Sequence, residues 1–263
     1  MDMLKKELAP LSTKVWQEIE TRAGEILRTR LAARKAVKVV GPLGWNYTSV
    51  TEGRLDIVGD SGDVKTGVYR STPLTEARVR FTLNRWEMDN LNRGARDIDL
   101  SSLESAVEKI ADFEENTIYY GFKAGGIVGL SEAASHKALP FGSNASAIME
   151  AVSKGVLHLQ QQSVDTPYAL IVGPEAYLAM SKEVQGIPLV ERIERLIKGK
   201  VIQSLTLKGA FLVPYDDENL ELVVGQDFAV GYESHDAKEV TLFITESFIF
   251  RVLNPAMVVP YTI

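Results

Sequence analysis

The sequence predicts a folded protein of mixed α+β class. Its 263 residues, 45 % of them hydrophobic, are enough to bury a sizeable core. In residues 11–36 and 101–121, apolar side chains recur every three or four positions, which is typical of helices. In residues 240–255, β-branched and aromatic side chains follow a two-residue period, which is typical of strands. Because the two patterns occupy separate stretches, helices and a paired sheet are both expected.

The composition argues against several classes of function. The chain has no cysteine and only three histidines, so disulfides and thiolate nucleophiles are excluded and a zinc enzyme is not expected. The net charge of −6 argues against a nucleic-acid binder, which needs a surface rich in Lys and Arg. The chain also lacks a run of eighteen apolar residues, and its start lacks the apolar core of a secretory signal. We therefore expect a cytoplasmic protein without a nucleic-acid or membrane partner.

The first predicted helix spans residues 11–36. Ser12 or Thr13 can cap its start, and Pro10 precedes it. The segment Gly41-Pro-Leu-Gly44 follows its end. On pattern alone this is an ordinary surface helix, and a helix that presents a docking groove is the functional alternative.

Residues 46–73 predict a long β-hairpin with its turn at Gly59-Asp-Ser-Gly-Asp63. The hairpin has little apolar content, so it cannot bury itself on its own. It either stays mobile or packs on a neighbouring subunit.

A strand at 79–83 leads into a short helix, for which Asn84 and Glu87 have capping-box spacing and which Gly94 ends. The next helix starts with a second capping box, at Ser101 and Glu104. Its neighbouring acids, Glu114 and Glu115, cannot share a helix face, so they are expected on a solvated surface rather than in a general-acid site.

Residues 121–129 are glycine-rich but lack the pattern of a phosphate-binding loop, and we interpret them as a crossover between domains. An α/β segment follows. It comprises a helix at 143–162, a strand at 168–172, helices that begin at Pro174 and Pro188, and strands at 200–207 and 209–213. The chain then ends with paired strands at 223–233 and 240–255.

No catalytic constellation emerges from the sequence. A cysteine–histidine pair is impossible, and the nucleophile-elbow motif G-x-S-x-G is absent. His136, His158 and His235 have no motif around them, so each is expected to be structural or exposed.

Five short motifs occur in an order that resembles the encapsulins (family 1), bacterial and archaeal shell proteins with the fold of tailed-phage capsid proteins. They are Gly41-Pro-x-Gly-Trp45, Trp86-Glu-x-Asp-Asn90, Asp99-Leu-Ser-Ser-Leu103, Gly225-Gln-Asp227 and Gly231-Tyr-Glu233. The resemblance implies the Hong Kong 97 phage-like capsid fold. Its parts would be a peripheral domain (1–47, 74–127 and 223–263), an extended loop (48–73) and an axial domain (128–222).

The resemblance also implies a structural function without turnover. Sixty copies would assemble into an icosahedral (T=1) nanocompartment, with pores for small ions, that encloses a cargo enzyme for iron storage or oxidative-stress defence. The cargo, a ferritin-like protein or a dye-decolorising peroxidase, would dock through a C-terminal targeting peptide. For that docking the resemblance points to Leu31, Arg34, Lys38, Val230 and Gly231. For the fivefold pore loop it points to Ser181, Lys182, Glu183, Val184, Gln185, Gly186 and Ile187.

Two alternatives remain open at this stage. In some encapsulins a tryptophan at the position of Trp86 stacks on flavin mononucleotide (FMN), and here Arg78 is the candidate for the phosphate or a ring oxygen. A shell with its own flavin-dependent, ferric-reductase-like role is therefore one alternative. The other is a prophage capsid subunit, which the acidic balance disfavours because a shell that packs DNA is expected to carry more positive charge.

Overall fold

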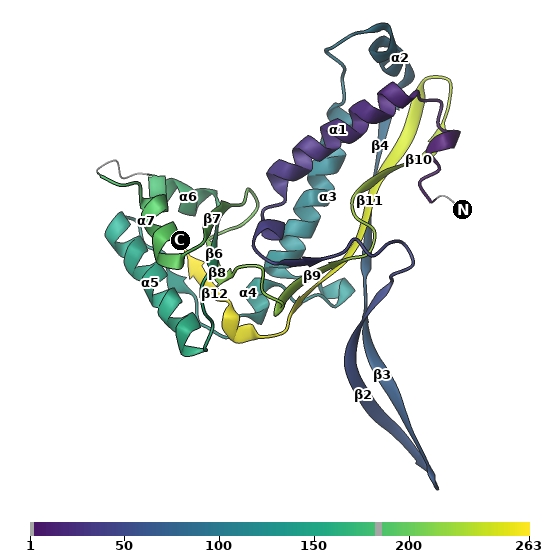
Figure 1. Ribbon diagram of the computed structural model, residues 1–263. Helices are drawn as coiled ribbons and strands as arrows, with labels where there is room; N and C mark the ends of the chain where they lie inside the picture. The colour runs from purple at the N-terminus through teal and green to yellow at the C-terminus, as the bar shows by residue number, and fades with distance from the viewer. Residues whose placement is uncertain (1–2, 182–185) are drawn as a thin grey trace.

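The computed structural model describes residues 3–181 and 186–263 (Figure 1). It contains two five-stranded sheets, each covered by helices, and a two-stranded hairpin that projects away from both. The helices are α1 (Thr13–Arg30), α2 (Arg85–Arg93), α3 (Ser101–Tyr120), α4 (Leu130–Ala133), α5 (Ala145–Gln161), α6 (Pro174–Ser181) and α7 (Leu189–Ile197). None of the described helices is long and apolar enough to cross a membrane.

The first sheet is built around its longest strand, β11 (Glu239–Val252). The first part of β11 lies between β4 (Thr75–Asn84) and β10 (Ala229–His235), antiparallel to both. Its second part pairs with β9 (Leu220–Val224), and β9 in turn pairs with β1 (Lys38–Val40). The paired strands predicted for the end of the chain are therefore confirmed, with β9 and β10 as separate strands.

Helices α1 and α3 pack against each other and cover one face of this sheet (Figure 1). Val15 and Ile19 of α1 meet Leu103 and Ile110 of α3 in a core that Leu242 of β11 completes. These side chains are excluded from solvent, and burial of a side chain of this size contributes about 1.5–3 kcal/mol. The apolar stripes read from the sequence thus form one sheet–helix interface.

The start of α1 and both ends of α2 follow the predicted capping chemistry. Ser12 accepts a hydrogen bond from the Val15 amide at the start of α1. Asn84 likewise caps α2, and Gly94 ends α2 in the left-handed region at φ 106°. The capping box predicted at Ser101 is wrong: Asp99 Oδ1 accepts from the Ser101 amide, and no side chain caps α3 from the residue before its first turn.

The second sheet has the order β5 (Leu139–Pro140), β12 (Val259–Thr262), β8 (Ala210–Pro214), β6 (Tyr168–Val172) and β7 (Lys200–Gln203). Helices α5, α6 and α7 enclose its central strands, and every residue of β6 and β8 is buried. Strand β12 comes from the end of the chain and pairs with β8. The last strand therefore pairs within the second sheet, although the resemblance groups residues 223–263 in the peripheral domain.

The hairpin consists of β2 (Ser49–Ser61) and β3 (Val64–Pro73), as predicted. It extends alone from the first sheet (Figure 1). Apolar side chains on both strands are largely exposed to solvent in the single chain, among them Leu55, Ile57, Val58, Val64, Val68 and Tyr69.

Candidate functional site

A groove runs between α1 and the segment that enters β10. It consists of two adjoining hollows of about 300 and 370 Å³, which share Leu27 and Phe228. The first hollow is lined by Lys6, Glu20, Ala23, Gly24, Leu27, Phe228, Ala229, Val230 and Ile244. The second is lined by Leu27, Arg28, Leu31, Arg34, Lys35, Asp227 and Phe228.

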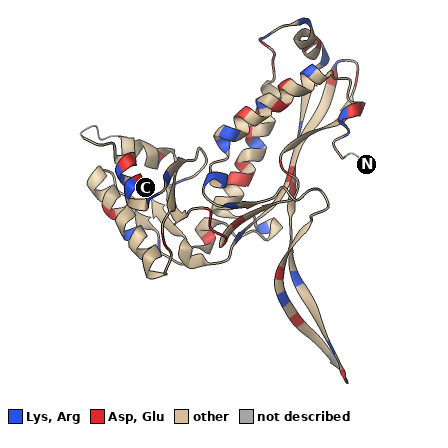
Figure 2. Ribbon diagram, in the orientation of Figure 1, with Lys and Arg blue, Asp and Glu red and all other residues tan. Residues whose placement is uncertain are grey.

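The sequence of α1 explains the groove's shape. Ala23 and Gly24 are small, so the helix leaves a depression where larger side chains would reach β10. The nearest atom to a Cβ built on Gly24 is Arg28 Nη1 at 3.5 Å, which means that this depression is open at Gly24. Most of the lining is apolar, while Lys6, Glu20, Arg28, Arg34, Lys35 and Asp227 contribute charges of both signs. The ribbon of α1 carries positions of both signs along its length (Figure 2). Such a groove suits an extended peptide with apolar side chains.

The structure brings together only part of the predicted docking set. Leu31 and Arg34 line the second hollow, and Val230 lines the first. Gly231 is next to Val230 on β10 and therefore faces the opposite side of the sheet, where a Cβ would meet the Phe243 ring at 2.3 Å. Lys38 lies on β1, where its Nζ is 3.3 Å from Asp216 Oδ2. Neither Gly231 nor Lys38 lines the two hollows.

Arg34 is not a free docking cation. Its side chain is only 15 % exposed and forms ion pairs with Glu114, Asp227 and Glu246. Arg34 Nε donates to Glu114 Oε1 at 2.8 Å, and Nη2 donates to Glu114 Oε2 at 2.5 Å. Nη1 donates to Asp227 Oδ1 at 2.9 Å, and Nη2 is 3.5 Å from Glu246 Oε2. Burial by itself lowers the pKa of Arg34, but the three acids outweigh it and raise that pKa above its ordinary value.

Glu114 and Glu115 were predicted on a solvated surface, and this was wrong because both are fully buried. Glu114 contacts the Arg34 side chain, whereas Glu115 contacts a different set of donors. Glu115 Oε1 accepts from the Ala33 amide at 2.7 Å, and its Oε2 accepts from Tyr119 Oη at 2.8 Å and Ser204 Oγ at 3.1 Å. Burial raises the pKa of Glu115 to about 7, although these three donors partly oppose the shift.

Glu246 of β11 is a third buried acid that the sequence reading missed. Burial, and secondarily the charge of Glu114, raises its pKa well above the ordinary value, while Arg34 opposes the shift. Among the described residues, Glu246 Oε1 has no hydrogen-bond partner. A signal was available, since Glu246 is the one carboxylate among the apolar and hydroxyl side chains of residues 240–250. Phe228 was missed as well, because no local pattern distinguishes an aromatic residue in a connecting segment.

The structure does not assemble Trp86 and Arg78 into one site. Trp86 is 67 % exposed at the start of α2, where the Arg93 guanidinium carbon lies 5.7 Å from its ring centroid. Arg78 lies on β4 six residues before the strand ends, which at the rise of a strand is about 20 Å from that end. There it packs over Phe243 at 4.1 Å and pairs with Glu76 at 2.9 Å.

The surroundings of Trp86 also oppose an anionic ligand. It lines a hollow of about 470 Å³ together with three carboxylic acids, Glu87, Asp99 and Glu239. These acids would repel a phosphate group placed beside the indole. The residues around Trp86 therefore do not favour a phosphate beside the indole, and FMN binding stays a prediction.

The predicted pore loop can be placed only at its ends. Ser181 is the last residue of α6 and donates from Oγ to the Tyr177 carbonyl at 2.9 Å. Gly186 and Ile187 precede α7, and Ile187 is 47 % exposed. Lys182, Glu183, Val184 and Gln185 lie outside the described residues.

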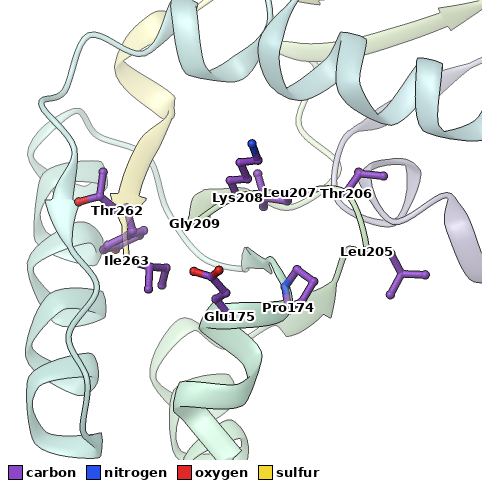
Figure 3. A pocket seen from close by; sticks show the side chains of 10 residues that line it. Pro174, Glu175, Leu205, Thr206, Leu207, Lys208, Gly209, Thr262 and Ile263 are labelled. Atoms are coloured by element: carbon purple, nitrogen blue, oxygen red, sulfur yellow. The ribbon is translucent and has the colours of Figure 1, made fainter.

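Another hollow, of about 510 Å³, lies at the end of β12 (Figure 3). Its charged lining residues, Glu175 and Lys208, project from different sides of it, and the remainder of the lining is mostly apolar. The three histidines have packing partners elsewhere: the rings of His136 and His158 stack at 5.0 Å, and His235 Nδ1 is 2.6 Å from Tyr232 Oη. Within the described residues, no group of three or more His, Asp or Glu side chains is arranged so that it could hold a metal ion.

Comparisons with known proteins agree with this architecture. A protein-family model described as "Encapsulating protein for peroxidase" matches residues 1–249. The type 1 encapsulin shell protein of Rhodospirillum rubrum is 38 % identical over 269 aligned positions, which cover 99 % of this chain and 96 % of the relative. Among solved structures, the virus-like particle from Pyrococcus furiosus matches with a TM-score of 0.69 at 18 % identity, covering 94 % of this chain and 98 % of that one. The capsid of the myovirus XM1 matches with a TM-score of 0.59 at 13 % identity, and the match covers 88 % of this chain and 91 % of that one. This chain therefore has the same fold as that capsid protein.

Proposed function

Because this chain belongs to the encapsulin family of shell proteins, we propose that sixty copies close into a T=1 icosahedral compartment around a cargo protein. The role of the chain is structural, as the names of its relatives state for them. Phage capsid proteins share the fold at much lower identity, so a prophage capsid is the less favoured assignment.

The observation that carries the shell proposal is the β2–β3 hairpin. Its two strands pair only with each other in the described chain, and Ile57 and Tyr69 are 69 % and 76 % exposed. A two-stranded ribbon is marginal in water, and exposed apolar side chains on paired strands favour association. A second copy of the chain is the partner that a shell provides. We therefore assign the hairpin to contacts between subunits.

For cargo we propose docking of an extended peptide in the groove between α1 and β10. Apolar side chains of the peptide enter the two hollows, which meet at Leu27 and Phe228. Rim cations at Lys6, Arg28 and Lys35 favour acidic residues in the peptide. The description of the matching family supports a peroxidase as cargo, and a ferritin-like protein is the second candidate. The compartment would then serve oxidative-stress defence or iron storage, with residues 181–187 lining a pore for small ions.

Assembly is tested by light scattering on the purified protein. At 29.0 kDa per chain, a T=1 shell has a mass of roughly 1.7 MDa. A monomer or small oligomer that keeps its secondary structure would contradict the shell proposal.

Docking is tested by filling the groove without disturbing the fold. We expect Gly24→Leu to occupy the first hollow, because the space at its Cβ is open and leucine is the better helix former by almost 1 kcal/mol. Shells of this variant should assemble normally and lose the protein that co-purifies with wild-type shells. Thr21→Leu is the matched control, since Thr21 is exposed on the same helix outside the groove. Retention of cargo by Gly24→Leu shells would contradict docking at this site.

A further inference from the structure

Beneath the groove, one cation is surrounded by three carboxyl groups. The Arg34 guanidinium contacts Glu114 and Glu246, both fully buried, and the half-buried Asp227. If all three acids were ionised, the cluster would carry two uncompensated negative charges, mostly out of contact with water. Burial of an unpaired charge is costly, so a group in this position keeps its proton instead.

Geometry indicates which acid keeps the proton. Glu114 receives three contacts of 2.5–3.0 Å from Arg34, and Asp227 has one of 2.9 Å and is also open to water. Glu246 has only a 3.5 Å contact to Arg34, and its Oε1 is buried without a partner. Glu246 is therefore the acid that gains least from ionisation. Burial, and after it the charge of Glu114, raises the pKa of Glu246, and Arg34 opposes this shift.

A short chain of contacts connects this cluster to the groove. The Arg34 guanidinium carbon lies 4.9 Å from the ring centroid of Phe228. Asp227 Oδ1, which accepts from Arg34, also accepts from the Phe228 amide at 2.9 Å. Phe228 in turn lines both hollows. The position of Arg34 thus fixes the wall that the two hollows share.

We infer that Glu246 is a positioning residue for cargo docking: as a neutral carboxylic acid it lets Glu114 and Asp227 hold Arg34 against Phe228, and its ionisation disturbs that wall. This inference rests on the docking role proposed above. Docking then depends on pH. The wall at Phe228 is ordered when Glu246 is protonated, and the peptide binds to this protonated form of the shell.

The direction of the pH effect follows from the charges that face Glu246. They are Arg34 from the segment after α1, Glu114 from α3 and Asp227 from the segment before β10. When the pH rises and Glu246 loses its proton, it competes with Glu114 and Asp227 for Arg34 and repels both. Docking should therefore weaken as the pH rises through the pKa of Glu246 and strengthen below it.

The test uses shells that are disassembled and then reassembled in the presence of a fluorescein-labelled synthetic peptide, because the proposed pores of a closed shell admit only small ions. The peptide has the sequence of the C-terminal segment of the protein that co-purifies with the shells. Fluorescence polarisation gives its dissociation constant between pH 6 and pH 9. We expect this constant to rise at least about tenfold for wild-type shells over that range. For Glu246→Gln shells it should stay at the wild-type pH 6 value throughout, because glutamine is neutral and of the same shape.

Two further variants serve as a control and as a replacement for a variant that does not assemble. Glu233→Gln, an exposed acid on the neighbouring strand β10, should keep the wild-type pH profile. If Glu246→Gln shells fail to form, Glu246→Met supplies a second side chain that cannot ionise. A flat profile for wild-type shells, or a wild-type slope in the variant at position 246, would overturn the inference.

A second readout needs no peptide. Hydrogen exchange of the Phe228 amide in empty shells reports the contact with Asp227 directly. At pH 9 we expect this amide to exchange severalfold faster in wild-type shells than in Glu246→Gln shells at the same pH, and equal rates would overturn the inference. If wild-type shells fail to bind the peptide at pH 6, the proposed docking in the groove is wrong. The exchange rate of the Phe228 amide then tests by itself whether Glu246 positions Phe228.

Discussion

Arg34→Met should destabilise the subunit strongly, although Arg34 lines a groove at the surface. The substitution leaves Glu114, which is fully buried and receives three hydrogen-bond contacts from Arg34, without its counter-ion. Removal of one partner from a buried ion pair costs about 3–5 kcal/mol, because the remaining charge stays out of water. That is a large fraction of the 5–15 kcal/mol typical of folded proteins.

The assay is guanidinium unfolding of purified shells at pH 7.5, followed by tryptophan fluorescence. Arg28→Met is the matched control, since Arg28 is exposed on the rim of the same groove and should change stability by less than about 0.5 kcal/mol. Adding Glu114→Gln to Arg34→Met should recover most of the lost stability, because the buried carboxylate is then replaced by a neutral side chain. A variant as stable as Arg28→Met would refute the buried-cluster interpretation of Arg34.

Two other predictions concern the core and the shell contacts. The pKa of Glu115 in the folded chain, about 7, exceeds the ordinary value of 4.5, so the folded chain binds an extra proton between these values. Stability therefore falls by about 3 kcal/mol as the pH rises from 4.5 to 7. Glu115→Gln should abolish this part of the slope in a denaturation series, and an unchanged slope would contradict the assignment. Ile57→Asp on the hairpin should leave the circular dichroism spectrum intact yet abolish the megadalton species in light scattering, because Ile57 is 69 % exposed in the single chain. Normal assembly of this variant would exclude Ile57 from the contacts.

Features that depend on a few consecutive residues were read correctly from the sequence. The hairpin around Gly62, the Asn84 cap of α2, its end at Gly94 and the strand Tyr168–Val172 all follow from spacing, turn chemistry and capping within a short window. The apolar stripe of α1 likewise fixed which face of that helix packs inward. These interactions are local, so the order of side chains along the chain is sufficient to specify them.

The candidate site was decided by tertiary structure. Arg34 meets Glu114, Asp227 and Glu246 across separations of 80, 193 and 212 residues, and no periodicity in the sequence links these positions. Glu114 was expected on a solvated surface because it is charged, although it lies four residues after the buried Ile110 on the same face of α3. Desolvation and charge pairing set the pKa values of Arg34 and Glu246, and both effects depend on which groups surround a side chain in space. The sequence by itself therefore determined the helices, the strands and the family resemblance. Tertiary structure decided which charged side chains are buried and which of them form the cluster beneath the groove.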